Sequence, residues 1–166
     1  MRRHFTATAF VVHEGRTLLH WHRKLGQWMP PGGHLLPAED PATGALREVR
    51  EETGLGVELL PLTPVFDFAY PRQLPAPHTV LVEDSPEAGE PHQHIDFIYF
   101  SRSLDDDAAR PPTGDDTLVW VSEAQLDANE PLPFEGAPVP VPADVRALAL
   151  AAIRLERDLR SSSAGE

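Results

Sequence analysis

The segment from Gly32 to Leu55 constrains the fold more than any other part of the chain. It opens with a pair of glycines, and its second half has the spacing of an amphipathic helix. Asp40 is a suitable N-cap, Pro41 favours the first helical turn, and Gly54 is a suitable stop. The sequence therefore predicts a glycine-containing turn followed by one short helix.

Three acidic side chains share one face of this predicted helix. Glu48, Glu51 and Glu52 are spaced i, i+3 and i+4, so Glu51 and Glu52 fall within about 60° on either side of Glu48. Like charges at this spacing repel by about 0.2–0.5 kcal/mol per pair, so a compensating partner is expected. A hard cation such as magnesium suits such oxygen ligands, whereas the alternative is a solvated acidic surface. A different face is predicted to pack against the core, and it carries Ala42, Leu46, Val49 and Thr53.

The fixed positions of the segment are Gly33, Glu39, the run Arg47-Glu48-Val49, the pair Glu51-Glu52 and the pair Gly54-Leu55. Their identities and spacing resemble the complete signature of the Nudix hydrolases. The resemblance implies an α/β (α+β) fold in which a mixed sheet lies between helices. It also implies metal-dependent hydrolysis of a diphosphate bond in a nucleoside diphosphate that is linked to another group.

The resemblance also assigns roles to residues within the signature. It implies that Mg²⁺ or Mn²⁺ is bound by the Gly32 carbonyl and by Glu48, Glu51 and Glu52. Glu51 and Glu52 are the first candidates for the general base, although some relatives use a glutamate outside the helix. The residues expected to support the structure of the motif are Gly33, Glu39, Arg47 and Gly54. Arg47 can reach Glu39 or Glu51 and bind a carboxylate with two hydrogen bonds.

Three residues outside the helix are candidates for contact with the substrate. Arg23 ends a predicted strand, where family members often carry a basic residue that touches phosphate; a solvated strand end is the alternative. His34 follows the glycine pair and is either a phosphate contact or an ordinary loop histidine. Asp116 precedes a predicted strand with a tryptophan, and in the family an acid there sometimes completes the metal site. Ala38 stands where many relatives have glycine.

His92, His94 and Asp96 alternate along a predicted central strand, so they share one face. Such a set can bind a transition metal, but no further soft ligand is near in the sequence. The face can instead line the substrate cleft, or it is an ordinary strand end.

The remaining elements complete a single predicted domain over residues 1–160. Strands are predicted for 5–13, 17–22, 57–62, 66–70, 79–82 and 95–100, a short helix for 122–129 and a long helix for 144–160. Residues 131–142 read as a proline-rich link and residues 161–166 as a disordered tail.

Composition limits the partners. The net charge of −12 argues against a nucleic acid polymer or an anionic membrane as a partner. The chain has no cysteine, which excludes disulfides and a thiol nucleophile, and no apolar run approaches a membrane span. We expect a cytoplasmic protein that acts on a small nucleotide derivative, with the 144–160 helix docking on the domain body or in a homodimer.

Two other functions are compatible with the same fold, namely a nucleotide-sensing module without turnover and a purely structural domain. Nucleotide-sensing relatives usually lose glutamates of the signature. This chain keeps Glu48, Glu51 and Glu52, which favours the hydrolase.

Overall fold

The centre of the fold is a parallel pair of long strands, β1 (Arg2–His13) and β7 (His92–Ser103). The computed structural model describes residues 2–85, 91–104 and 117–163. Residues 6–12 of β1 are all buried, because β1 lies in the interior of the sheet and both of its faces are covered. The predicted central strand at residues 95–100 is thus the middle of β7.

Within the described residues, the other strands of the sheet are added antiparallel to this pair or to β2. They are β2 (Arg16–His22), β3 (Gln27–Met29), β4 (Gly32–His34), β5 (Val57–Leu59), β6 (Thr79–Asp84) and β8 (Leu118–Ser122). β2 and β4 pair with β1, β5 and β6 pair with β7, and β3 and β8 pair with β2. A separate hairpin is formed by β9 (Leu132–Phe134) and β10 (Ala137–Val139).

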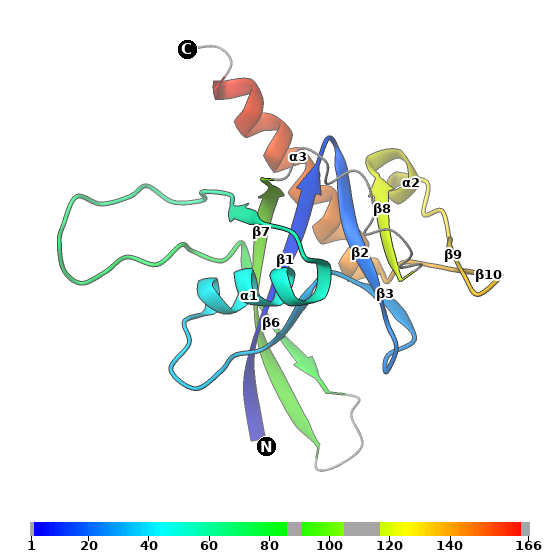
Figure 1. Cartoon of the computed structure of the whole chain (residues 1–166), viewed down its shortest axis with the longest axis horizontal. Coiled ribbons are helices and arrows are strands. Elements are labelled where there is room, and N and C mark those ends of the chain that lie inside the picture. Colours follow the sequence, from blue (N-terminus) through cyan, green and yellow to red (C-terminus); the bar gives the residue numbers. More distant parts are fainter. Residues whose placement is uncertain (1, 86–90, 105–116, 164–166) are drawn as a thin grey trace.

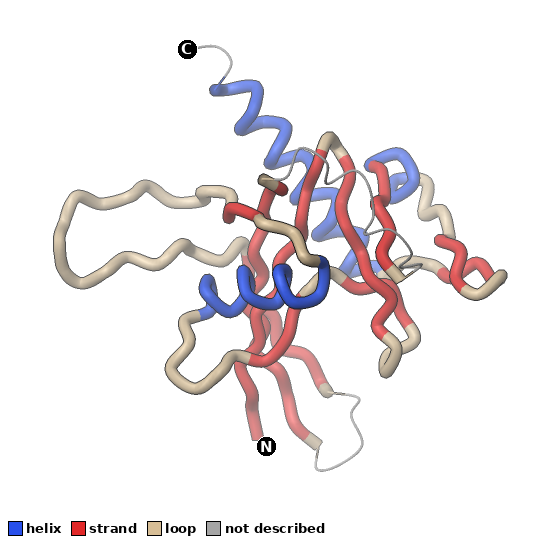
Figure 2. Tube along the Cα trace, in the orientation of Figure 1, coloured by secondary structure: helices blue, strands red, loops and turns tan. Residues whose placement is uncertain are grey.

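Helices cover both faces of this sheet. In Figure 1, α1 (Pro41–Thr53) lies in front of the sheet and α3 (Ala143–Ser163) lies behind it, while the short α2 (Glu123–Asp127) follows β8. Figure 2 shows the same layers by type of element. Alternate residues of β1 face the two helices: Ala7 and Ala9 pack in the cluster of α1, and Phe10 and Val12 in the cluster of α3. The predicted mixed sheet between helices is confirmed. None of the described helices has the length and apolar character needed to cross a membrane.

The boundaries predicted for α1 are confirmed. The Asp40 carboxylate accepts a hydrogen bond of 2.9 Å from the Thr43 N–H, Pro41 is the first helical residue, and Gly54 has a φ of 74°. The prediction for Leu46 is wrong, because that side chain is 38% exposed and Ala45 is buried in its place. A short alanine side chain lets α1 lie close over the alanines of β1.

The predicted strand at residues 66–70 is also wrong, since residues 61–78 form a loop. β5 and β6 already occupy the edge of β7, at residues 101–103 and 93–98, so the segment between them has no free edge to pair with. Its aromatic side chains, Phe66, Phe68 and Tyr70, are exposed. The Arg72 guanidinium ties this loop to Asp40, the N-cap of α1, at 2.9 Å.

Near the C-terminus the structure adds a hairpin, shortens one predicted helix and extends another. The expected proline-rich link at 131–142 contains the β9–β10 hairpin, whose turn places Glu135 and Gly136 at φ values of 49° and 81°. The short helix ends at Asp127, before the predicted residue 129. Residues 161–163 of the expected tail continue the helix, and each serine hydroxyl donates to the carbonyl four residues earlier. Residues 164–166 lie outside the described part of the chain.

The loop before α1 contains a strained residue, and this predicts a stabilising substitution. Ala38 has a φ of 66°, a left-handed conformation that costs a residue with a Cβ about 1–2 kcal/mol. We expect Ala38→Gly to raise the free energy of unfolding by about 0.5–1 kcal/mol after the added flexibility of the unfolded chain is subtracted. Chemical denaturation measures this change.

The matched control is Ala147→Gly, at an exposed position inside α3. Glycine in a helix interior lowers stability by about 1 kcal/mol relative to alanine. The two substitutions should therefore shift the denaturation midpoint in opposite directions. A loss of stability in both would contradict the strain assigned to Ala38.

Candidate active site

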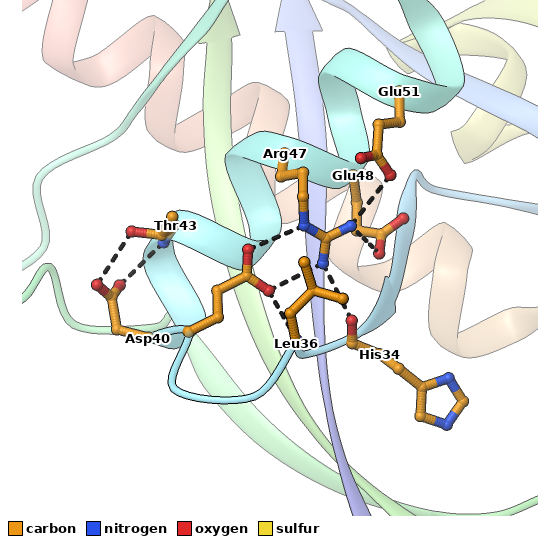
Figure 3. Close-up of polar contacts among 8 residues, drawn as sticks. His34, Leu36, Asp40, Thr43, Arg47, Glu48 and Glu51 are labelled. Carbon is orange, nitrogen blue, oxygen red and sulfur yellow. Dashed lines mark hydrogen bonds and ion pairs between the residues drawn. The ribbon is translucent and has the colours of Figure 1, made fainter.

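One guanidinium organises the carboxylates of α1. Arg47 binds Glu39 through two parallel contacts of 2.9 Å, from Nε to Oε1 and from Nη2 to Oε2. Its Nη1 donates to Glu48 Oε1 at 2.7 Å and to Glu51 Oε2 at 3.1 Å, and its Nη2 also donates to the carbonyl of His34 at 3.1 Å. Figure 3 shows these contacts reaching from the helix to the preceding loop.

Arg47 therefore supplies part of the compensation that the clustered carboxylates require. The Arg47 guanidinium holds the pKa of Glu39 below its usual range, and the same contacts raise the pKa of Arg47 itself. Glu39 also accepts a hydrogen bond of 2.9 Å from the Leu36 N–H, so it fixes the loop to the helix. The predicted contact between Arg47 and Glu39 is confirmed.

The glycine pair brings the backbone of β4 close to two further carboxylates. A Cβ at Gly33 would lie 2.6 Å from Glu48 Oε1, so only glycine leaves that carboxylate in place. A Cβ at Gly32 would lie 2.9 Å from the carbonyl oxygen of Ala7, in the neighbouring strand. The Gly32 N–H donates to Glu52 Oε2 at 3.0 Å, which joins the end of α1 to the edge of the sheet.

The backbone pairing of β4 also sets the direction of the Gly32 carbonyl. The Leu35 N–H donates to Phe5 O and the Ala9 N–H donates to Pro31 O, each at 3.0 Å. Odd-numbered residues therefore occupy the hydrogen-bonded positions opposite β1. Gly32 is an even-numbered residue of the same stretch, so its N–H and C=O both face away from β1.

Glu52 differs from an ordinary surface carboxylate. Its pKa is raised to about 7, mainly by burial and also by the charges of Glu48 and Glu51, while the hydrogen bond from Gly32 acts in the opposite direction. The side chain is 30% exposed, and the His20 Nε2 lies 3.6 Å from Glu52 Oε2. The carboxylate cluster on α1 therefore includes one group, Glu52, whose pKa is raised mainly by burial.

A cleft of about 270 Å³ opens on the other side of the glycine pair. Gly32 and His34 line it together with β1, β6, β7 and the start of α3. Asp96 lies on its wall and accepts hydrogen bonds from the hydroxyls of Thr6, at 2.9 Å, and Thr8, at 2.8 Å. Burial raises the pKa of Asp96 in spite of these bonds.

The cleft has a distinctly acidic end. Glu83 of β6 and Asp144 of α3 line it with Asp96. Burial raises the pKa of Glu83, and the charges of Asp96 and Asp144 add to the effect. This end of the cleft therefore suits hydrogen-bond donors and repels phosphate.

The structure brings some of the predicted substrate contacts together and not others. His34 lines the cleft, whereas Arg23 is exposed in the turn after β2, and its neighbour Lys24 lines the cleft instead. Asp116 lies outside the described residues. His94 and Asp96 line the cleft, which was one of the alternatives predicted for their strand face.

Several residues of the site were not identified from the sequence. Thr6, Thr8, Glu83 and Asp144 reach it through long-range strand pairing and helix packing. The alternation of Thr6 and Thr8 along β1, opposite the alternating polar residues of β7, is a signal that could have indicated two of them.

Comparison with known proteins agrees with this geometry. The model of the NUDIX domain matches residues 2–140. A MutT-like protein of Streptomyces ambofaciens is 45% identical over 65 residues, which are 38% of this chain and 42% of that protein. The match thus spans less than half of the length of this relative.

Solved structures show the same fold. A hydrolase of the NUDIX family from Clostridium perfringens aligns over 93% of this chain and 99% of its own, with 28% identity and a TM-score of 0.73. The Ap4A hydrolase of C. elegans aligns over 96% of this chain and 98% of its own, with 17% identity and a TM-score of 0.52. This similarity is one of fold alone. Since the family model covers most of the residues and the signature carboxylates lie together on α1, the chain belongs to the Nudix hydrolase family.

Proposed function

We propose that this protein hydrolyses the diphosphate bond of a nucleoside diphosphate derivative with the help of Mg²⁺ or Mn²⁺. The observation that carries the proposal is the position of Glu48 and Glu52. Both carboxylates lie against the glycine pair that also lines the cleft. The similarity to a NUDIX hydrolase over nearly the whole chain supports the same activity.

The donor atoms on α1 and β4 fit a hard divalent cation. Carboxylate and carbonyl oxygens are the ligands that Mg²⁺ and Mn²⁺ prefer. Glu48, Glu51, Glu52 and the Gly32 carbonyl would hold the ion. Arg47 contacts one oxygen of Glu48 and one of Glu51, and each carboxylate has a second oxygen that a cation can share.

When bound, such an ion neutralises phosphate charge and lowers the pKa of a coordinated water. The protein itself supplies the acceptor for the proton of the attacking water. Glu52 suits this role because its Oε2 lies 3.0 Å from the Gly32 N–H and 3.6 Å from His20 Nε2, and both of these residues line the cleft. Glu51 remains a candidate as well, since the family resemblance names Glu51 and Glu52 together as the first choices.

The charge of the cleft orients the substrate. Glu83 and Asp144, which line the cleft, favour the hydroxyl and amino groups of a nucleoside over phosphates, whereas Asp96 already accepts hydrogen bonds from Thr6 and Thr8. The diphosphate would then lie near Gly32 and the side chains of Lys24 and His34, which line the cleft, whereas Arg23 remains a predicted phosphate contact. Asp116 remains a predicted contact, and a homodimer and a cytoplasmic location also remain predictions.

The proposed activity is tested with a panel of nucleoside diphosphate derivatives and purified protein. We expect hydrolysis with Mg²⁺ or Mn²⁺ and none with chelator. Replacing Glu52 by Gln should lower kcat by about 10²–10⁴, the range typical of a general base. Glu130→Gln, an exposed carboxylate in the loop after α2, is the matched control and should keep full activity.

Failure to hydrolyse any compound of the panel would favour the alternative function, a nucleotide-sensing module. Tight binding of a nucleotide without hydrolysis of any compound would indicate a sensing module. Equal activity of wild type and Glu52→Gln would remove Glu52 from the mechanism.

The two glycines of β4 should respond differently to alanine. At Gly33 the Cβ meets the end of the Glu48 side chain, which can move, so Gly33→Ala should weaken Mn²⁺ binding with little loss of stability. At Gly32 the Cβ meets the backbone of Ala7 and Thr8, which cannot move freely, so Gly32→Ala should lower the free energy of unfolding. Mn²⁺ titration and chemical denaturation separate the two effects, and equal stability of the two variants would contradict this explanation.

The raised pKa of Glu52 predicts a pH dependence of stability. In the folded protein without metal, the Glu52 carboxyl keeps its proton up to about pH 7. An ordinary glutamate, with a pKa of 4.5, loses its proton at a lower pH. The contribution of Glu52 to stability is therefore lost as the pH rises through this range. In chelator, Glu52→Gln should gain stability relative to wild type between about pH 5 and pH 8.

Denaturant titrations at several pH values measure this difference. Glu130→Gln is again the control, and its difference from wild type should stay constant with pH. A constant difference for Glu52→Gln as well would show that the pKa of Glu52 is ordinary.

A further inference from the structure

Three histidines meet at the end of the sheet that carries the N-terminus, although they are far apart in the sequence. The parallel register of β1 and β7 places His4 beside His94 and Arg2 beside His92. His92 and His94 share one face of β7, and His4 lies on the same face of β1 because paired residues point to the same side. His4, His92 and His94 are all partly buried.

The three rings are close enough to share an ion. One ligand atom from each histidine lies within 4.8 Å of the other two. The ring of His4 lies 4.7 Å from that of His92, and the rings of His92 and His94 are 5.2 Å apart, measured between centroids. Three nitrogens bound to one tetrahedral zinc are about 3.3 Å apart, since each bond is 2.0–2.1 Å. Small rotations of the imidazoles therefore close the site.

We propose that His4, His92 and His94 bind a zinc-class divalent cation at a site separate from the carboxylates of α1. The two sites differ in donor atoms: imidazole nitrogen selects zinc and related transition metals, whereas carboxylate oxygen suits magnesium and manganese. The site is assembled only by strand pairing, so it exists in the folded protein and not in the unfolded chain. Zinc bound there clamps β1 to β7.

The histidine cluster lies beside the cleft. His34 of β4 flanks the cluster, with ring centroids 5.4 Å from His4 and 4.9 Å from His94. Both His34 and His94 line the cleft. A water or an oxygen of a bound ligand can take the fourth position, which gives this ion access to a substrate in the cleft.

The zinc site also has a structural connection to the carboxylates of α1. The His34 carbonyl accepts a hydrogen bond of 3.1 Å from Arg47, and His34 follows Gly33, which contacts Glu48. Zinc at the histidines would fix β1, with which β4 pairs, and β4 in turn contacts the carboxylate cluster.

Zinc titration of the whole chain with saturating Mg²⁺ present tests the proposal. We expect one equivalent of Zn²⁺ per chain and a higher melting temperature than with Mg²⁺ alone. His4→Gln and His92→Gln should each weaken Zn²⁺ binding by at least about 100-fold, since even outer-shell partners cost 10–100-fold. His13→Gln, at the other end of β1, is the matched control and should bind like wild type.

Two further measurements keep the test decisive. Co²⁺ in place of Zn²⁺ should give the intense visible absorption of a four-coordinate ion, and Glu52→Gln should leave that spectrum unchanged. The histidine ring signals in the NMR spectrum of the wild type should shift on addition of Zn²⁺, which requires no variant to fold.

The proposal is overturned if Zn²⁺ binds His4→Gln and His92→Gln as tightly as wild type, or if Glu52→Gln abolishes the binding. It is also overturned if inorganic phosphate stabilises the wild type through these histidines while Zn²⁺ does not. Protonated histidines would then form an anion site instead.

Discussion

The candidate active site depends on the shared guanidinium of Arg47. Three carboxylates on one turn of a helix repel each other, and Arg47 offsets this by contacting Glu48 and Glu51 while it binds Glu39 with two hydrogen bonds. A lysine could not do the same, because it lacks the planar fork that reaches several carboxylates at once. The side chain thus joins the loop, the helix and the backbone of β4 before any cation is bound.

The two glycines show how closely the helix and the sheet are fitted together. Gly33 gives space to the Glu48 carboxylate on the side of α1, and Gly32 gives space to the backbone of β1. β4 therefore contacts both the carboxylate cluster and the cleft. A single three-residue strand therefore connects the group that can accept a proton with the space that can hold a substrate.

Local features of the sequence predicted α1 and its ends, because capping residues and helical spacing act over only a few positions. The contact of Arg47 with Glu39 was predictable for the same reason. The burial of Ala45 in place of Leu46 was not, since it depends on the small residues of β1 that α1 meets. The strand predicted at 66–70 does not form, because β5 and β6 already pair with the edge of β7 that it would need. His4 could not be joined to His92 and His94 from the sequence alone, because the register of a parallel pair is not encoded nearby.

The parallel pairing of β1 with β7 has a consequence for how the chain reaches this structure. Thr6 meets Asp96 across a separation of 90 residues, and both faces of the sheet depend on that pairing. Contacts between such distant positions close large loops, which slows folding relative to proteins rich in local contacts. During synthesis β1 leaves the ribosome long before β7 has been made. Its apolar stretch therefore has no strand of β7 to pair with during that time. The segment that ends up most deeply buried is thus the one exposed longest to aggregation or to chaperones.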